Sequence, residues 1–336
     1  MTVILIVMSS LAVVRAQGKT DVVYLANGDR ITGEVDRLER GRLEFKTDDA
    51  GTLYLEWDKL RSVVTTRVVQ VLISDGRTFL GSLAATTDRS IAVVGSGGTE
   101  SLPMSEVTLI TPIGRSFWRK IDGSFDAGFS YTRSSGVAQL NVNSDSAYRR
   151  PSYLAQLTAS LTQTEQSDDS GGDDRGVIDV LYLRYPWPRW FVAVAGRAET
   201  NESLGLKLRA QGGATIGPRL VNSNRAQLTI GAGLVFNEEQ GVDVETTQNL
   251  EALFSLRWSF FTYDRPKTNL DFNIQYFPSL SNAGRQRVQL NTAFKREIWK
   301  DLFLAFSGYD TFDSRPPNPD AEKNDVGVVT SIGWTY

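Results

Sequence analysis

The chain has 336 residues, of which 22% are charged and 41% hydrophobic, and its formal net charge is −3. The length is enough for two domains, the charge content is too high for a bundle of membrane helices, and the weakly acidic balance gives no reason to expect a nucleic-acid partner. The sequence contains no histidine and no cysteine. This excludes Ser-His-Asp and Cys-His catalytic sites, histidine-ligated metals and disulfides. We therefore expect a protein that is not an enzyme and uses no cofactor.

The first segment is a short apolar run, from Val3 to Val14, followed by small residues. Val14 and Ala16 occupy the −3 and −1 positions for cleavage after Ala16, and the run is too short to span a bilayer, which predicts a signal peptide at residues 1–16. A buried N-terminal strand or helix is the alternative. No later segment has eighteen consecutive apolar residues. Contact with a membrane would therefore be peripheral or through a closed β-barrel.

Residues 18–113 contain two copies of one pattern. A β-rich run, a tight turn and a second strand occur around Asn27-Gly28 and again around Asp75-Gly76, 48 residues later. Asn-Gly and Asp-Gly between apolar runs are strong hairpin signals. We predict a tandem of two small barrels of the SH3-like or Sm-like kind, each with about five strands, followed by a linker at residues 114–123. Trp57 is interpreted as a core residue, with a binding platform as the alternative.

From residue 124 to residue 336 apolar and polar residues alternate over long segments. In Leu250–Phe260 the even positions are apolar, whereas the odd positions include Glu251 and Arg257. Such segments run to about ten residues, against about five or six in globular domains, and match tilted membrane-crossing strands. The pattern therefore predicts an outer-membrane antiparallel β-barrel at residues 124–336, with a soluble β-sandwich as the alternative.

The alternation gives about twelve strands, an even number as expected for bacterial single-chain barrels. Their predicted starts are Ser124, Ala138, Ser152, Arg175, Arg189, Leu204, Ala226, Gln248, Thr268, Arg285, Asp301 and Asp325. The hairpin of residues 177–195 alternates least clearly. Connections after odd-numbered strands are mostly long and polar, and those after even-numbered strands are tighter and carry Pro, Trp, Lys or Arg. This asymmetry predicts that the front domain and the tight turns lie in the periplasm.

The last strand alternates up to an aromatic residue at Tyr336. With Gly333 and Trp334 it resembles the C-terminal strand by which outer-membrane proteins are recognised, so the barrel-assembly machinery is an expected partner. Six charged residues are predicted to face the lumen of the barrel. They are Lys207, Arg209, Glu251, Arg257, Asp271 and Lys295. If these charges pair across the lumen the barrel is plugged, and if they line one wall it conducts small solutes.

The front motif Asn27–Val35 together with the barrel pattern resembles the family called domain of unknown function 481, whose members are described as salt-induced outer-membrane proteins. The resemblance implies a location in the cell envelope, here the outer membrane of a Gram-negative bacterium, and it supplies no catalytic or ligand-binding residues.

Three classes of function remain open. The first is a non-enzymatic barrel, either structural in the envelope or a narrow, porin-like pore, surrounded by outer-membrane lipid and lipopolysaccharide. The second is a periplasmic adaptor, in which the front domain binds peptidoglycan or a protein partner and the barrel is its anchor. The third is a hydrolase built from carboxylates alone, for which the candidates are Asp168, Asp169, Asp173 and Asp174. We interpret that acidic segment as a solvated loop, which could loosely hold divalent cations near lipopolysaccharide phosphates.

Overall fold

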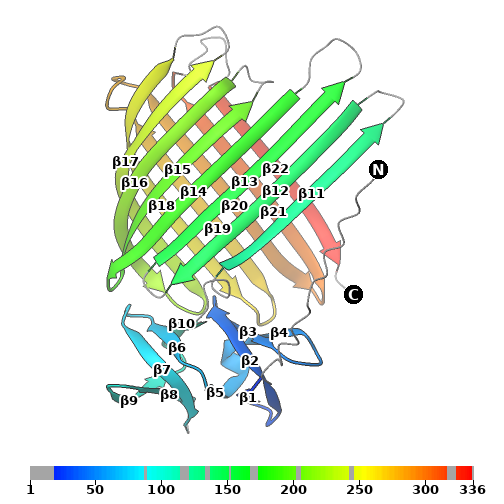
Figure 1. Cartoon of the computed structure of the whole chain (residues 1–336), viewed down its shortest axis with the longest axis vertical. Helices are drawn as coiled ribbons and strands as arrows, with labels where there is room; N and C mark the ends of the chain where they lie inside the picture. Colours follow the sequence, from blue (N-terminus) through cyan, green and yellow to red (C-terminus); the bar gives the residue numbers. More distant parts are fainter. Residues whose placement is uncertain are drawn as a thin grey trace, which may run out of the picture.

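The computed structural model describes residues 19–86, 89–113, 121–132, 137–150, 153–166, 173–201, 206–241, 246–315 and 323–334. The chain is all-β and forms two antiparallel sheets, a front sheet of ten strands and a back sheet of twelve. Figure 1 shows the front sheet, in blue to cyan, beneath one end of the long strands of the back sheet. The predicted signal peptide, most of the predicted linker and Tyr336 lie outside the described residues.

Among the residues described, no helix is long and apolar enough to cross a membrane.

The front sheet follows the two sequence repeats, with five strands in each. The first repeat holds β1 (Asp21–Leu25), β2 (Arg30–Glu39), β3 (Arg42–Lys46), β4 (Thr52–Glu56), a 3-10 turn (Trp57–Lys59) and β5 (Leu60–Val64). The second holds β6 (Val69–Ile73), β7 (Thr78–Ala85), β8 (Ser90–Gly95), β9 (Gly98–Pro103) and β10 (Val107–Pro112). Gly28 and Gly76 have φ angles of 98° and 93°, as expected for the Asn-Gly and Asp-Gly turns that identified the repeat.

The two repeats are interleaved rather than separate. Strand β10 of the second repeat pairs with β2 of the first as well as with β6. At the other junction the Thr65 backbone amide, after β5, donates to the Leu83 carbonyl on β7. The expectation of two separate small barrels is therefore corrected to one ten-stranded unit, because the last strand of each repeat reaches the neighbouring repeat.

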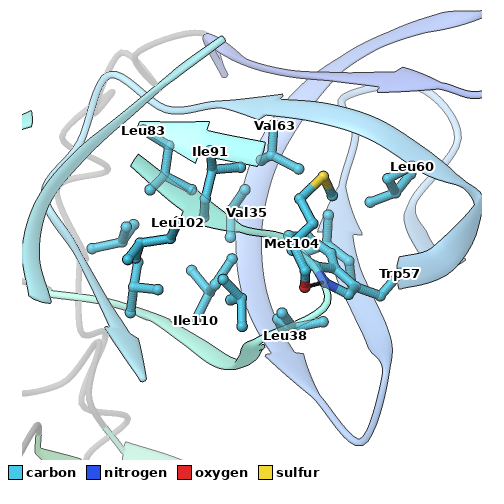
Figure 2. Close-up of a cluster of buried hydrophobic side chains, with 14 of the residues drawn as sticks. Val35, Leu38, Trp57, Leu60, Val63, Leu83, Ile91, Leu102, Met104 and Ile110 are labelled. Carbon is cyan, nitrogen blue, oxygen red and sulfur yellow. Dashed lines mark hydrogen bonds between the residues drawn. The ribbon is translucent and has the colours of Figure 1, made fainter. Parts of the chain in front are cut away.

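One hydrophobic core serves both repeats, as Figure 2 shows. Val23, Leu38 and Phe45 of the first repeat and Leu83 and Ile110 of the second belong to the same buried cluster. Trp57 is also part of it, with 2% of its surface exposed, and its indole Nε1 donates a hydrogen bond of 2.6 Å to the Met104 carbonyl. The interpretation of Trp57 as a core residue is therefore confirmed.

The back sheet is a meander in which each strand pairs with its neighbours in sequence. Its strands are β11 (Ile121–Thr132), β12 (Val137–Arg150), β13 (Tyr153–Gln166), β14 (Asp173–Trp187), β15 (Trp190–Asn201), β16 (Leu206–Asn222), β17 (Ala226–Gly241), β18 (Thr247–Thr262), β19 (Thr268–Pro278), β20 (Gln286–Trp299), β21 (Leu302–Asp313) and β22 (Asn324–Trp334). The predicted number of twelve is confirmed, and each predicted start lies within three residues of the observed one. Within the described part of the chain, β11 and β22 are not hydrogen-bonded to each other.

The alternation along each strand divides the back sheet into two faces. We call the face that carries Glu251 the polar face and the face that carries Leu250 the apolar face. Because paired residues on neighbouring strands lie on the same face, the register assigns residues of all twelve strands to one face or the other. The least clear predicted hairpin corresponds to β14 and β15, where Leu181 and Leu183 lie on the polar face opposite Ala195 and Ala193. Both faces are apolar there, which weakens the sequence signal.

Candidate functional site

The polar face is the candidate site because burial on the back sheet is inverted relative to a globular protein. On β18 the carboxylate residue Glu251 is fully buried, whereas its apolar neighbour Leu250 is 40% exposed and Phe254 is 51% exposed. The same inversion occurs on β17, where Asn237 and Glu239 are buried and Phe236 is exposed. Buried charges are costly unless they are paired and hydrogen-bonded, so the arrangement of these side chains must supply partners.

A chain of ion pairs crosses β14 to β17 near the end of the sheet remote from the front domain. Arg197 on β15 contacts Asp179 on β14 at 3.3 Å and Glu199 on its own strand at 3.4 Å. Arg209 on β16 contacts Glu199 at 3.8 Å and donates to Glu239 on β17 at 3.0 Å. Each arginine thus lies between two carboxylates, which balances most of the charge within the wall of the sheet.

Two further pairs continue this chain on β18 to β21. Arg287 on β20 donates to both carboxylate oxygens of Glu251 on β18, with its Nε at 2.8 Å from Oε1. Arg285, which is buried, donates to Asp313 on β21 with an Nη2–Oδ2 distance of 2.6 Å. These are two-point guanidinium–carboxylate contacts, the geometry in which such pairs are strongest. We call the pairs from Asp179 to Asp313 the upper network.

At the opposite end of the polar face, a residue of the front domain enters the back sheet. Arg40, at the tip of the β2–β3 hairpin, donates to Asn269 at 2.8 Å and lies 3.3 Å from Asp271. Its guanidinium carbon is 4.5 Å from the centre of the Phe261 ring. The Ser259 hydroxyl donates to Asp271 at 2.6 Å and completes the contact. These four partners lie on the polar face of β18 and β19, so we call them, with Arg40, the lower latch.

The tight turns of the back sheet hold the front domain beside the lower latch. In the β16–β17 turn, Asn222 donates to Thr108 Oγ1 at 2.9 Å and Asn224 donates to the Val107 carbonyl at 2.8 Å. In the β18–β19 turn, Asp264 accepts a hydrogen bond of 2.7 Å from Lys59. This hydrogen bond and the charge of Lys59 hold the pKa of Asp264 below its usual range, and the same contact raises the pKa of Lys59. Both groups are therefore charged at neutral pH.

The structure places the six predicted lumen residues at different points. Arg209 and Glu251 belong to the upper network and Asp271 to the lower latch. Lys295 pairs with Asn269 in the register, which puts it on the polar face, and its Nζ lies 4.6 Å from the centre of the Phe303 ring. Arg257 lies on the polar face opposite Asn273 and is exposed. Lys207 is exposed beside a register shift of β16 and joins neither cluster.

The other predicted residues fall at the ends of strands. Trp334 is 73% exposed at the end of β22, and Gly333 pairs with Phe303. Asp168 and Asp169 lie outside the described residues, and Asp174 accepts a hydrogen bond of 3.3 Å from Gln163 on β13. Among the described residues, no group of three or more carboxylates is arranged to hold a metal ion.

Sequence reasoning missed two kinds of residue in the site. The first kind lies on the same face of the sheet as the predicted lumen residues and comprises Arg197, Glu199 and Glu239. The period-two alternation of the strands could therefore have identified them. Arg40 had no such signal, because it lies at a hairpin tip in the other domain and its partners are more than 200 residues away in the sequence.

A family model described as a protein of unknown function, DUF481, matches residues 123–336, which span the back sheet almost exactly as β11 to β22 do. No curated protein and no solved structure matches the chain.

Proposed function

The chain belongs to the DUF481 family, and from this membership and the inverted burial of its back sheet we propose that it is a non-enzymatic outer-membrane β-barrel that forms a narrow pore, with the front domain in the periplasm. The observation that carries the proposal is the apolar face. It exposes large apolar side chains on strand after strand while the opposite face buries carboxylates. In water this distribution is unfavourable by about 25 cal/mol for each Å² of exposed apolar surface, whereas lipid tails would cover that surface.

The dimensions of the apolar face fit a bilayer. On β18 the exposed apolar residues run from Leu250 to Phe260. Ten residue steps at about 3.3 Å each give roughly 33 Å along the strand, which corresponds to a height of about 25 Å at the strand tilt of about 40° usual for such barrels. This is the height of the apolar band in outer-membrane proteins.

Exposed tryptophans gather near the end of the back sheet that faces the front domain. Trp187 and Trp190 flank the β14–β15 turn, Trp299 ends β20 and Trp334 ends β22. Tryptophan favours the boundary between lipid tails and water, because its ring is apolar and its indole N–H needs a polar partner. These residues would form the periplasmic aromatic girdle.

Closure of the sheet is part of the proposal. An open edge in lipid would leave backbone N–H and C=O groups without partners at several kcal/mol each, so β11 must pair with β22 in a membrane. Because the meander has twelve strands, β11 and β22 run in opposite directions, and their pairing would be antiparallel like every other pairing of the sheet.

The arrangement of charges favours a pore over a lumen blocked by charge pairs that span it. The described pairs of the upper network lie within one strand, join adjacent strands or join β18 to β20, and so run along the wall. Charges that line a wall leave a wet path between them, whereas charges that pair across the lumen would block it.

A periplasmic adaptor is the second candidate, and one observation favours it. The front domain has its own hydrophobic core and presents a shallow pocket between Phe79, Leu80 and Val93 on a side formed by β7, β8 and β9. A peptidoglycan fragment or an extended peptide could be bound there while the barrel serves as the anchor.

The test of the proposed function is expression of the full chain in a Gram-negative host, followed by membrane fractionation and gel electrophoresis with and without boiling. We expect the protein in the outer-membrane fraction, extractable only with detergent, with different migration before and after boiling. A protein that stays in solution without detergent would refute the barrel. Proteoliposomes with entrapped solutes of increasing size then measure permeability, and an adaptor without a pore would leave them impermeable.

A further inference from the structure

We infer that the front domain is a built-in plug of the barrel, in which Arg40 closes the periplasmic end of the lumen. The inference rests on the proposed function and adds a mechanism of closure to it. It starts from the β2–β3 hairpin, whose tip consists of Arg40 and Gly41 between the paired residues Glu39 and Arg42.

The backbone conformation of Arg40 is unfavourable for arginine, so the turn alone does not explain why arginine occupies this position. Arg40 and Gly41 have φ angles of 52° and 72°, as in the two-residue type I′ turn. That turn favours asparagine, aspartate or glycine at its first position, because other side chains are strained in the left-handed region. A strained residue of this kind persists where surrounding contacts hold it, and such positions are frequent at sites of function.

The contacts that hold Arg40 lie inside the strand ends of the back sheet. Phe261 is one residue before the end of β18, and Asp271 is the fourth residue of β19. The guanidinium is therefore inserted about two to three residues deep, or roughly 7–10 Å at 3.3 Å for each residue. It meets a ring face, an amide oxygen and a carboxylate at once.

The backbone next to Arg40 also approaches the back sheet closely. A Cβ atom on Gly41 would lie 2.5 Å from the Asn224 carbonyl oxygen, so only glycine permits this approach of the hairpin to the β16–β17 turn. A second approach occurs at Gly76, where a Cβ atom would lie 2.7 Å from the Arg189 backbone nitrogen in the β14–β15 turn. The front domain thus rests on three successive tight turns, with Lys59–Asp264 at the third.

These contacts have the character of a releasable latch rather than of a permanent core. The charged contacts are part-exposed ion pairs at Arg40, Lys59 and Arg225, and beside them lies the buried hydrogen bond from Asn222 to Thr108. All of these contacts are polar, in contrast to the apolar core within the front domain. Exposed ion pairs are weak individually and are screened by salt within about 10 Å at 0.1 M. High ionic strength is therefore expected to favour release of the plug.

The experiment measures the conductance of the full-length protein in planar bilayers for three variants. Arg40→Asn removes the guanidinium and keeps a residue that the turn prefers, so the hairpin should fold. Arg37→Ala is the matched control, because Arg37 pairs with Glu39 and Glu44 within the front domain. The third variant adds Asp58→Cys and Arg225→Cys to Arg40→Asn, and a short bismaleimide then joins the front domain to the β16–β17 turn. The chain has no other cysteine, so the cross-link is specific.

We expect Arg40→Asn to conduct several-fold more than the unmodified protein, Arg37→Ala to match the unmodified protein, and the cross-linked variant to return to the low level. Raising the salt concentration from 0.1 M to 1 M should increase the open time of the unmodified protein but not that of the cross-linked one. Equal conductance or equal absence of conductance in all variants would overturn the plug. The heat-modified migration of the same samples distinguishes this result from failure of the barrel itself, because a protein that never inserts shows no folded band.

Discussion

Arg287 on β20 reaches across β19 and binds Glu251 on β18 with two hydrogen bonds, although Glu251 is completely buried. Arg287 pairs with Phe277 of the strand between them, and its guanidinium carbon lies 4.8 Å from the centre of the Phe277 ring. Glu251 pairs with Ser279, the residue after the end of β19. The pair thus joins three strands at the end of the sheet remote from the front domain.

Breaking this pair should destabilise the back sheet strongly. Glu251→Ala leaves the Arg287 guanidinium buried without its carboxylate, and loss of one partner of a buried pair typically costs about 3–5 kcal/mol. The variant pair Glu251→Gln and Arg287→Met should recover part of the loss, because no full charge is then left unpaired. Urea unfolding in detergent, monitored by the conversion of the folded gel band to the unfolded one, measures the loss in the single variant and the recovery in the double variant. A loss below about 1 kcal/mol for Glu251→Ala would mean that the contact is not formed in the folded protein.

The contact between Lys59 and Asp264 should make docking of the front domain depend on pH at both extremes. The hydrogen bond and charge of Lys59 lower the pKa of Asp264 from its ordinary 3.8, so the contribution of Asp264 is complete above that value and is lost as pH falls through the docked pKa. The hydrogen bond and charge of Asp264 raise the pKa of Lys59 from its ordinary 10.5, so the contribution of Lys59 is lost only as pH rises beyond that value. Docking should therefore be constant across the neutral range and weaken below about pH 4.

Spin labels can measure this dependence away from the titrating groups. Val68 of the front domain and Trp299 at the rim of the back sheet are both exposed, so cysteines at these positions accept labels without disturbing a core. The distance distribution between them should broaden in acid, and in Asp264→Asn it should be broad already at neutral pH. An unchanged distribution down to pH 3 would show that the acid step does not pass through Asp264.

Substitution of two glycines with similar backbone conformations can distinguish strain in a turn from loss of docking between the front domain and the back sheet. Gly41 and Gly51 have φ angles of 72° and 67°, so alanine should cost about 1 kcal/mol at either one. A Cβ atom at Gly51 meets nothing within 4 Å, whereas at Gly41 it meets the Asn224 carbonyl oxygen. We expect both variants to lower the unfolding midpoint of the front domain to a similar degree, and only Gly41→Ala to broaden the spin-label distance distribution. Equal broadening in both would refute close docking at the hairpin.

The sequence predicted the strands of the back sheet because a strand with one apolar and one polar face has a period of exactly two residues. That periodicity also puts Arg209, Glu251 and Asp271 on one face. It does not tell which charges meet, because pairs such as Glu251–Arg287 depend on strand lengths and on irregular ends. Lys207 illustrates the limit, since a register shift in β16 separates it from the network that its spacing suggests.

The front domain was predicted less completely, for a topological reason. Local signals identified its hairpins, because Asn-Gly and Asp-Gly specify tight turns. The pairing of β10 with β2 of the other repeat is decided by long-range burial, and nothing in the local sequence distinguishes two separate cores from one shared core. Arg40 belongs to the same class, since its role depends on where the whole domain is docked.

Trp57 should be essential to the folding of the front domain. Its indole N–H is bonded to the Met104 carbonyl between the two repeats, and the ring is buried. Trp57→Phe removes one of two hydrogen bonds that this carbonyl accepts, the other coming from the Val107 backbone amide, which costs about 0.5–1.5 kcal/mol, and it also leaves space in the core. Trp187→Phe is the control, because Trp187 is exposed at the end of β14. Near-ultraviolet circular dichroism during urea titration should show an earlier transition for Trp57→Phe alone. Equal midpoints for the two variants would contradict the role of Trp57 in joining the repeats.

The assignment of the two faces of the back sheet can be tested by placing the same charge on each. Phe254 lies on the apolar face of β18, and Gln275 lies on the polar face of the adjacent strand β19, opposite Ser255. An arginine that faces lipid near the centre of the bilayer costs about 2–4 kcal/mol, whereas one that faces a wet lumen costs little. Phe254→Arg should therefore lower the free energy of unfolding in vesicles by that amount. The free energy of unfolding of Gln275→Arg should stay close to that of the unmodified protein. Because the two positions are in neighbouring strands near the same height, a similar loss in both variants, or a larger loss for Gln275→Arg, would mean that the apolar face does not meet lipid.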